Sequence, residues 1–287
     1  MTALTLALAT VWIAGCGVGG NEESDEVGRA RLDRVASTII MPLDEYDISD
    51  AGWATISRAR ELAFANCMAK LGVIDANPPE SLLSEDRDYG LWNVERARLY
   101  GFGSVPADEA PAASEEPPGV YRELDPAWVE ARSSCIGSLA SEVEPFTPPD
   151  EIAARPATFQ VKIEAHKLAE KDPQWKAHRD EWWQCLKNVG LIAPPEEDAW
   201  SSQQTRDLTR SMADPNNPSP AEKEEEIRIA VKEATCNEET ALTQKLGDIE
   251  AGYQVPLIKG KQAMLNEQKS KNLEYVAKAE KYLATHQ

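Results

Sequence analysis

The sequence predicts an all-α protein: a helical body stapled by two disulfides, followed by long C-terminal helices. Helix-start signals with 3.6-residue apolar spacing recur along the chain, and no stretch alternates as a strand would. A cysteine-containing helix end also occurs twice, as FANCMAKLGVI at 64–74 and WWQCLKNVGLI at 182–192. In both copies a glycine five residues after the cysteine allows the left-handed turn that ends a helix. A later Pro-Pro pair prevents the helix from resuming.

The composition is that of a folded, strongly acidic protein. The 287 residues include 42% hydrophobic and 28% charged residues, enough for a core that needs no metal. Lys and Arg number 30 against 49 Asp and Glu, which gives a formal charge of −19. Such a body repels phosphate backbones and anionic headgroups, so nucleic acid is excluded as a partner.

The N-terminus predicts export and lipidation. Residues 3–14 form an apolar run of 12, the length of a signal-peptide core and shorter than the roughly 20 residues that span a bilayer. The run ends in Ile-Ala-Gly-Cys, which resembles a bacterial lipobox. We therefore predict a signal peptide at 1–15, a diacylglycerol on Cys16, and a lipidated N-terminus with a flexible acidic tether over 16–40. The predicted location is the outer face of the cytoplasmic membrane.

Two other interpretations of this N-terminus stay open. Only Met1 and Thr2 precede the apolar run, so the basic residues typical of a signal peptide are missing. Ordinary signal-peptidase cleavage would leave Cys16 unmodified, and an uncleaved apolar start is the second alternative.

Export accounts for the other four cysteines as disulfides, since an even number in an oxidising compartment indicates pairing. Of the three possible pairings, the repeat favours Cys67 with Cys135 and Cys185 with Cys236. These bonds close loops of 68 and 51 residues, each worth about 4 kcal/mol on the loop-entropy model. No C-x-x-C pair occurs, and the three histidines, His166, His178 and His286, are not spaced as metal ligands. We therefore predict no metal site.

A first cysteine-paired unit is predicted over 41–150. Its first helix covers 50–71, capped by Ser49 or Asp50. One apolar stripe is expected on that helix, from Trp53, Ile56, Ala63, Cys67 and Leu71. A short helix follows at 94–99, then a Pro/Ala/Glu-rich loop at 104–119 and a helix from Asp125-Pro126 to about 143.

The second cysteine-paired unit is predicted over 151–250. Helices are expected at 152–170, 172–190 and 201–212, the second opened by Asp172-Pro173. That helix carries one stripe, formed by Trp175, His178, Trp182, Cys185 and Val189. A packed core explains such a stripe better than a ligand cage does, and a hydrogen-bonded core histidine explains His178 better than a ligand or pH-sensing site.

A long helix is predicted from the capping box at Ser219 to Tyr253. Its apolar face has the 3- and 4-residue steps of a coiled-coil seam: Ile227, Val231, Ala234, Leu242, Leu246, Ile249 and Tyr253. Pro256 should kink or break it, so the C-terminal unit, 251–287, is either a kinked rod or a hairpin. Residues 259–281 hold six Lys and three Glu. This stretch is either a basic arm for anionic lipid or wall polymer, or a solvated face docked on the acidic body.

No catalytic or cofactor motif is present: the chain lacks G-x-S-x-G, H-E-x-x-H, a phosphate-binding glycine loop and C-x-x-C-H. Asp44, Asp47 and Asp50 cluster before the first long helix, but their spacing is not that of an EF-hand. We therefore predict no catalytic residue, no cofactor and no metal ligand.

Several short motifs resemble a family of uncharacterised secreted lipoproteins of actinobacteria, over about residues 42–257. They are Pro-Leu-Asp-x-Tyr at 42–46, Cys-Met-Ala-x-x-Gly at 67–72, Tyr-Gly at 89–90 and 100–101, Asp-Pro at 172–173 leading to Trp-x-Cys at 183–185 and Gly190, and Ile-Glu-Ala-x-Tyr-Gln-x-x-Leu-Ile at 249–258. The resemblance implies an envelope lipoprotein with paired cysteines and no established activity.

The sequence therefore predicts a membrane-anchored extracytoplasmic lipoprotein with a non-enzymatic binding or assembly role. Its predicted partners are the membrane, through the diacylglycerol anchor, and an unidentified envelope protein or wall polymer. Two alternatives remain: a hydrolase acting on the cell wall, and an envelope redox or stress sensor that uses its disulfides.

Overall fold

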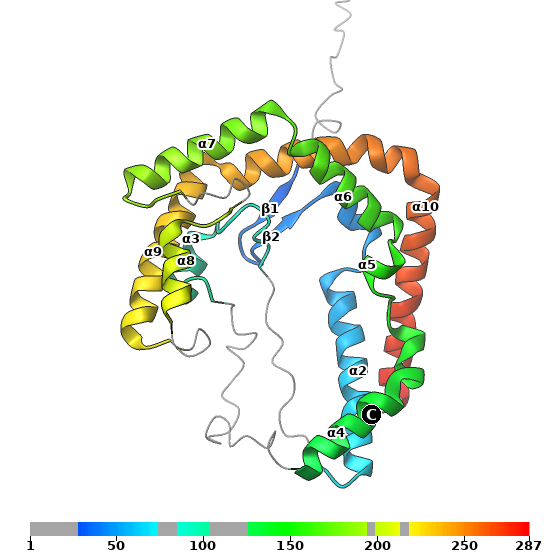
Figure 1. Ribbon diagram of the computed structural model, residues 1–287. Coiled ribbons are helices and arrows are strands. Elements are labelled where there is room, and N and C mark those ends of the chain that lie inside the picture. The colour runs from blue at the N-terminus through cyan, green and yellow to red at the C-terminus, as the bar shows by residue number, and fades with distance from the viewer. Residues whose placement is uncertain (1–27, 74–84, 104–125, 194–198, 213–217, 287) are drawn as a thin grey trace, which may run out of the picture.

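The computed structural model describes residues 28–73, 85–103, 126–193, 199–212 and 218–286, and Figure 1 shows their arrangement. The all-α prediction is confirmed for these ranges, which contain one short hairpin besides the helices. The signal peptide, Cys16, the rest of the predicted tether up to residue 27 and the loop at 104–119 lie outside them. The elements are β1 Arg31–Asp33, β2 Thr38–Ile40, η1 Pro42–Tyr46, α2 Asp50–Lys70, α3 Val94–Tyr100, α4 Pro126–Val143, η3 Glu144–Phe146, α5 Glu151–Ala154, α6 Ala157–Ala169, α7 Pro173–Asn188, α8 Gln203–Ser211, α9 Pro220–Thr240 and α10 Leu242–His286.

The longest helix, α10, is the element on which the others assemble. It runs across the upper part of the view, bends, and descends beside α2 (Figure 1). Its first half packs with α7 and the hairpin, its middle with α6 and η1, and its last turns with α2 and η3. Within the described ranges no helix combines the length and the apolar composition needed to cross a bilayer.

The short hairpin at residues 31–40 was not predicted, because no strand pattern was recognised in the sequence. β1 and β2 pair antiparallel, with Leu32 opposite Ile39. Each strand has three residues, too few for an alternating pattern to be recognised in a sequence. The connection also contains Ser37 at φ 57°, where a glycine or asparagine would have signalled the turn.

The first core joins α2, α4, η3 and the end of α10. The structure bonds Cys67 to Cys135 across α2 and α4, one of the two pairs that the repeat favours. The predicted stripe on α2 is partly wrong, because Trp53 and Leu71 are 41% and 50% exposed. Ile56 and Ala63 of the stripe are buried, and the buried side also contains Gly52, Ala59 and Met68. A Cβ at Gly52 would lie 2.8 Å from Ile48 Cγ2 and 3.1 Å from Val276 Cγ2, so a larger residue would have to displace Ile48 before α2 and crowd α10.

The second core joins the hairpin, α7, α9 and the first half of α10, and it contains the Cys185–Cys236 bond. Trp175 and Trp182 are buried as predicted, whereas Val189 is 36% exposed. The segment 85–103 packs here through α3 and α9, although it lies within the predicted first unit. The boundaries at 150 and 250 remain predictions.

Two predicted helices are interrupted. The helix expected at 152–170 divides at Arg155, which has φ 46°, and restarts after Pro156. Pro156 has no N–H to donate and would clash with the carbonyl four residues before it. The helix expected to run from 219 to 253 ends at Thr240, and Ala241 is left-handed. Asn237 explains this break, because its Oδ1 accepts from the backbone N and from Oγ1 of Thr243 at 3.0 and 2.9 Å. The side chain thus holds an amide of the first turn of α10.

The C-terminal unit is a bent rod, with no hairpin. The helix α10 continues through Pro256 and bends at Lys261, where φ is −115° and ψ 16°. Gly260 immediately precedes the bend, and glycine costs a helix about 1 kcal/mol relative to alanine. Just beyond the bend, Gln262 donates to the Tyr46 hydroxyl and Leu265 is buried against η1 and α6. The bend thus lies where α10 turns to contact η1.

Candidate functional site

The candidate site is a cavity of about 890 Å³ between the hairpin, η1 and the junction of α9 with α10. This volume is within the range of small-molecule and cofactor sites. We call it the hairpin pocket. Its lining residues are Arg29, Ala30, Arg31, Leu32, Arg34, Ile40, Met41, Pro42, Glu45, Trp92, Asn237, Glu238, Ala241, Thr243 and Gln244.

One wall of the hairpin pocket depends on a close approach of the chain to α10. A Cβ at Gly247 would lie 2.7 Å from the Ala30 Cβ, so only glycine lets the start of the hairpin reach the helix. Gln244 then donates to the Ala30 carbonyl at 2.8 Å, and the Ala30 N–H donates to Asp248 at 3.0 Å. Three contacts from one face of α10 therefore fix the first lining residues.

Substitutions at two glycines of α10 should have opposite effects on stability. Gly247→Ala should lower the free energy of unfolding by about 1–3 kcal/mol, because the added methyl overpacks against Ala30. Gly252→Ala should raise it by about 0.5–1 kcal/mol, since a Cβ there meets nothing within 4 Å and alanine favours a helix. Urea unfolding of both variants measures the two values. Equal effects of the two substitutions would show that the hairpin does not dock closely on α10.

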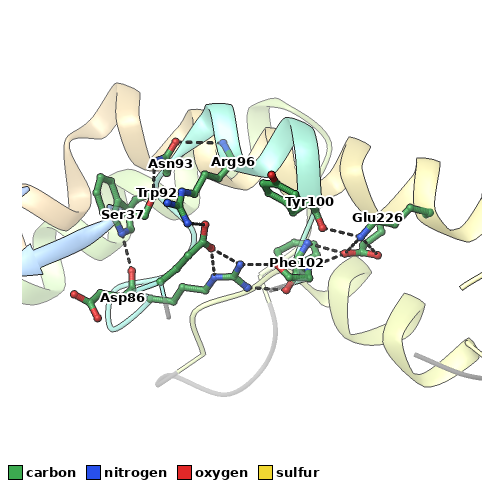
Figure 2. Close-up of polar contacts among 12 residues, drawn as sticks. Ser37, Asp86, Trp92, Asn93, Arg96, Tyr100, Phe102 and Glu226 are labelled. Atoms are coloured by element: carbon green, nitrogen blue, oxygen red, sulfur yellow. Dashed lines mark hydrogen bonds and ion pairs between the residues drawn. The ribbon is translucent and has the colours of Figure 1, made fainter. Parts of the chain in front are cut away.

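The opposite wall is held by the segment 85–103, shown in Figure 2. Asp86 accepts from the Ile39 N–H at 2.7 Å, and its carbonyl accepts from Trp92 Nε1 at 2.7 Å. Asn93 Nδ2 donates to the Arg34 carbonyl at 2.8 Å and also to the Ser37 hydroxyl. These bonds tie the hairpin to the loop before α3 and orient the Trp92 ring toward the cavity it lines.

The far end of the same segment is anchored on α9 (Figure 2). Glu226 Oε1 accepts the N–H groups of Phe102 and Gly103 at 2.7 and 3.1 Å. Lys223 donates to the Tyr100 carbonyl and to Glu226. Gly101 has φ 64°, and a Cβ there would lie 2.5 Å from Glu226 Oε1, so the anchor requires glycine. The Tyr100-Gly101 motif is thus a docking element for α9.

Three arginines give the hairpin pocket its charge. Arg29 pairs with Asp248 at 2.9 Å and Arg34 pairs with Glu238 at 2.6 Å. Among the described residues, Arg31 has no carboxylate within ion-pair distance, so its guanidinium is available to an anion. The Arg31 side chain is exposed to solvent at the edge of the hairpin pocket.

A buried polar cluster surrounds Glu250 of α10, and it was not predicted. Glu250 is 4% exposed, and its Oε2 contacts the Tyr89 hydroxyl at 2.9 Å and His166 Nδ1 at 2.8 Å. The hydrogen bond to Glu250 raises the pKa of His166, with a smaller contribution from the charge of Glu170. Burial and Glu250 together raise the pKa of Tyr89. The raised pKa favours the protonated form of the His166 ring beside the buried Glu250 side chain. Because the other ring nitrogen, Nε2, faces Glu170 at 3.5 Å, this arrangement disfavours a general base at neutral pH.

The raised pKa of His166 predicts a pH-dependent stability. The imidazolium–carboxylate contact stabilises the fold fully below the unfolded pKa near 6.5 and is lost as pH rises through the higher folded value. The stability advantage of wild type over His166→Gln should thus be larger at pH 5.5 than at pH 8.5, by less than about 1 kcal/mol since the ring is partly exposed. Urea unfolding at both pH values measures it. A constant or growing advantage at pH 8.5 would contradict the assignment.

The predicted site residues are distributed as follows. Cys16 lies outside the described residues, and Cys67, Cys135, Cys185 and Cys236 are paired as the repeat favours. His178 Nδ1 contacts Glu181 at 3.4 Å on its own helix, which agrees with a hydrogen-bonded histidine. Nowhere in the described ranges do three or more His, Cys, Asp or Glu side chains form a group able to hold a metal ion. The aspartates at 44, 47 and 50 form no such group.

Comparisons with protein-family models, with curated proteins and with solved structures found no match to this chain. The resemblance to actinobacterial lipoproteins therefore remains a prediction from short motifs.

Proposed function

We propose that the protein is a membrane-anchored extracytoplasmic lipoprotein with a non-enzymatic binding or assembly role in the cell envelope. The hairpin pocket is the observation that carries the binding role. The described residues that line it include no cysteine, serine, histidine or lysine, so the usual nucleophile and base pairs are missing among them. Its two carboxylates are in ion pairs, Glu238 with Arg34 and Glu45 with Lys269 at 3.7 Å. A cavity with hydrogen-bonded walls and ion-paired acids favours binding over hydrolysis.

The position of the hairpin pocket along the chain supports a role near the membrane. Arg29 follows Cys16 by 13 residues, and a chain of that length reaches at most about 45 Å. A lipid on Cys16 would hold the pocket within that distance of the bilayer. The two disulfides support the extracytoplasmic location, because such bonds persist in oxidising compartments.

Cross-linking of the tagged protein in living host cells tests this function. Wild type should capture one partner, identified by mass spectrometry, and Cys16→Ala should lose it because the untethered protein leaves the membrane. Arg31→Glu should also lose it, because the exposed cation of the hairpin pocket is reversed.

Arg58→Glu is the matched control, since Arg58 is exposed on α2 away from the hairpin pocket. It should keep the partner. Equal capture by all three variants would contradict the proposal, and turnover of wall polymer by the purified chain would replace it with the hydrolase alternative.

A further inference from the structure

The outer face of α6 carries a second hollow, which we call the α6 groove. It has a volume of about 450 Å³ and lies between α6, Arg155 and the bend of α10. Its lining residues are Arg155, Phe159, Gln160, Ile163, Glu164, Lys167, Leu168, Lys171 and Lys261. None of them belongs to the hairpin pocket or to the cluster around Glu250.

The charge of the α6 groove is opposite to that of the body. Four of its lining residues are cationic and one is acidic, in a chain whose formal charge is −19. Glu164 pairs with Lys261 at 3.7 Å. Among the described residues, no carboxylate lies within ion-pair distance of Arg155, Lys167 or Lys171. Three cations of the α6 groove therefore have no ion-paired carboxylate in the described part of the chain, an arrangement that attracts an anion.

Apolar side chains lie between these cations. Ile163 and Leu168 are 39% and 37% exposed, and Phe159 is half-buried beside them. Cations around partly exposed apolar side chains are the composition of a surface that rests in the headgroup region of an anionic membrane. A soluble anion would use the cations and leave the apolar side chains exposed to water.

The position of the α6 groove fits such a contact. Figure 1 shows the start of β1, α6 and the bend of α10 all in the upper part of the view. The end of the described chain nearest to Cys16 in sequence is thus at the same end of the molecule as the α6 groove. An anchor at Cys16 would keep this end within reach of the bilayer.

We propose that the α6 groove docks on anionic phospholipid headgroups of the membrane that anchors the protein. Arg155, Lys167 and Lys171 contact lipid phosphates, while Ile163 and Leu168 lie against the glycerol and upper acyl region. This deepens the proposed function, on whose membrane anchor it rests. The anchor holds the protein at the membrane, and the α6 groove fixes its orientation there.

Lysine labelling of the full chain tests this docking. Protein purified from host membranes is reconstituted into vesicles of phosphatidylcholine alone or with phosphatidylglycerol, then treated briefly with an amine acetylating reagent. Mass spectrometry reads the acetylation rate at each lysine. Rates at Lys167 and Lys171 should fall at least threefold in the anionic vesicles. The rates at Lys70 and Lys187, which are exposed on α2 and α7, should not change.

A charge-reversal pair provides the variant test. In Lys167→Glu/Lys171→Glu, the anionic vesicles should no longer protect Lys261, the remaining lysine of the α6 groove. The matched variant Lys70→Glu/Lys187→Glu changes the net charge equally and should keep the protection. All four side chains are exposed, so both variants should fold.

The outcomes separate this inference from the proposed function. Membrane-bound protein with a lipidated Cys16 and equal labelling in both vesicle types would overturn the docking alone. Protein without a lipid would overturn the proposed anchor, and the labelling would then be repeated with vesicles added from outside. Protection by millimolar inorganic phosphate without vesicles would show a site for soluble phosphate and would overturn the lipid assignment.

Discussion

Replacing both Cys185 and Cys236 by alanine is expected to lower the free energy of unfolding by about 4 kcal/mol. The bond joins α7 to α9 within the core that also holds the tryptophans, and it closes a separation of 51 residues. Without the bond, the unfolded chain regains the conformational entropy that the closed loop had removed, and the unfolded state becomes more favourable. Urea unfolding at neutral pH under non-reducing conditions measures the effect.

The other disulfide is the internal control. Cys67 and Cys135 close a separation of 68 residues, and loop-closure entropy varies slowly with length. The two double variants should therefore lose the same stability within a few tenths of a kcal/mol. A loss below about 1 kcal/mol for either pair would show that its bond adds little to the fold.

Trp182→Ala should lower the free energy of unfolding by about 3–5 kcal/mol, the second large effect. The side chain is fully buried and lies near the Trp200 ring, with centroids 6.2 Å apart. Its removal leaves a cavity between α7 and the loop before α8. Thermal and urea unfolding, followed by circular dichroism, measure the loss.

Trp182→Phe separates packing from hydrogen bonding. Among the described residues Trp182 Nε1 has no hydrogen-bond partner, so phenylalanine removes a donor that gains nothing from folding. We expect less than half the loss caused by alanine. A phenylalanine variant as unstable as the alanine variant would indicate that the indole N–H has a partner, such as a buried water.

Much of the helical fold could be predicted because its signals are local. Ser49, Asp172 and Ser219 each cap a helix as the sequence indicates, and Pro173 and Pro220 occupy first turns. The cysteine pairing could be proposed because the chain repeats a helix end. These features depend on residues that are close together in the chain, so they can be recognised in a single sequence.

The missed features depend on contacts between distant residues. The end of α9 requires the Asn237 side chain to hold Thr243, and Ala241 itself carries no signal of a left-handed turn. The hairpin pocket requires Gly247 to meet Ala30, which lies more than 200 residues earlier. His166 and Glu250 are 84 residues apart, and nothing near either residue predicts their contact. Because the chain contains 49 acids, a buried and partnered carboxyl group such as that of Glu250 cannot be told from the others in the sequence.

The most direct test of the account is the intact mass of the protein recovered from host membranes. The account predicts a chain that begins at Cys16 and carries the additional mass of a diacylglycerol. It also predicts four fewer hydrogens than the reduced chain, two for each disulfide. A chain that retains residues 1–15, or one cut elsewhere with an unmodified Cys16, would contradict the membrane-anchored binding protein proposed here.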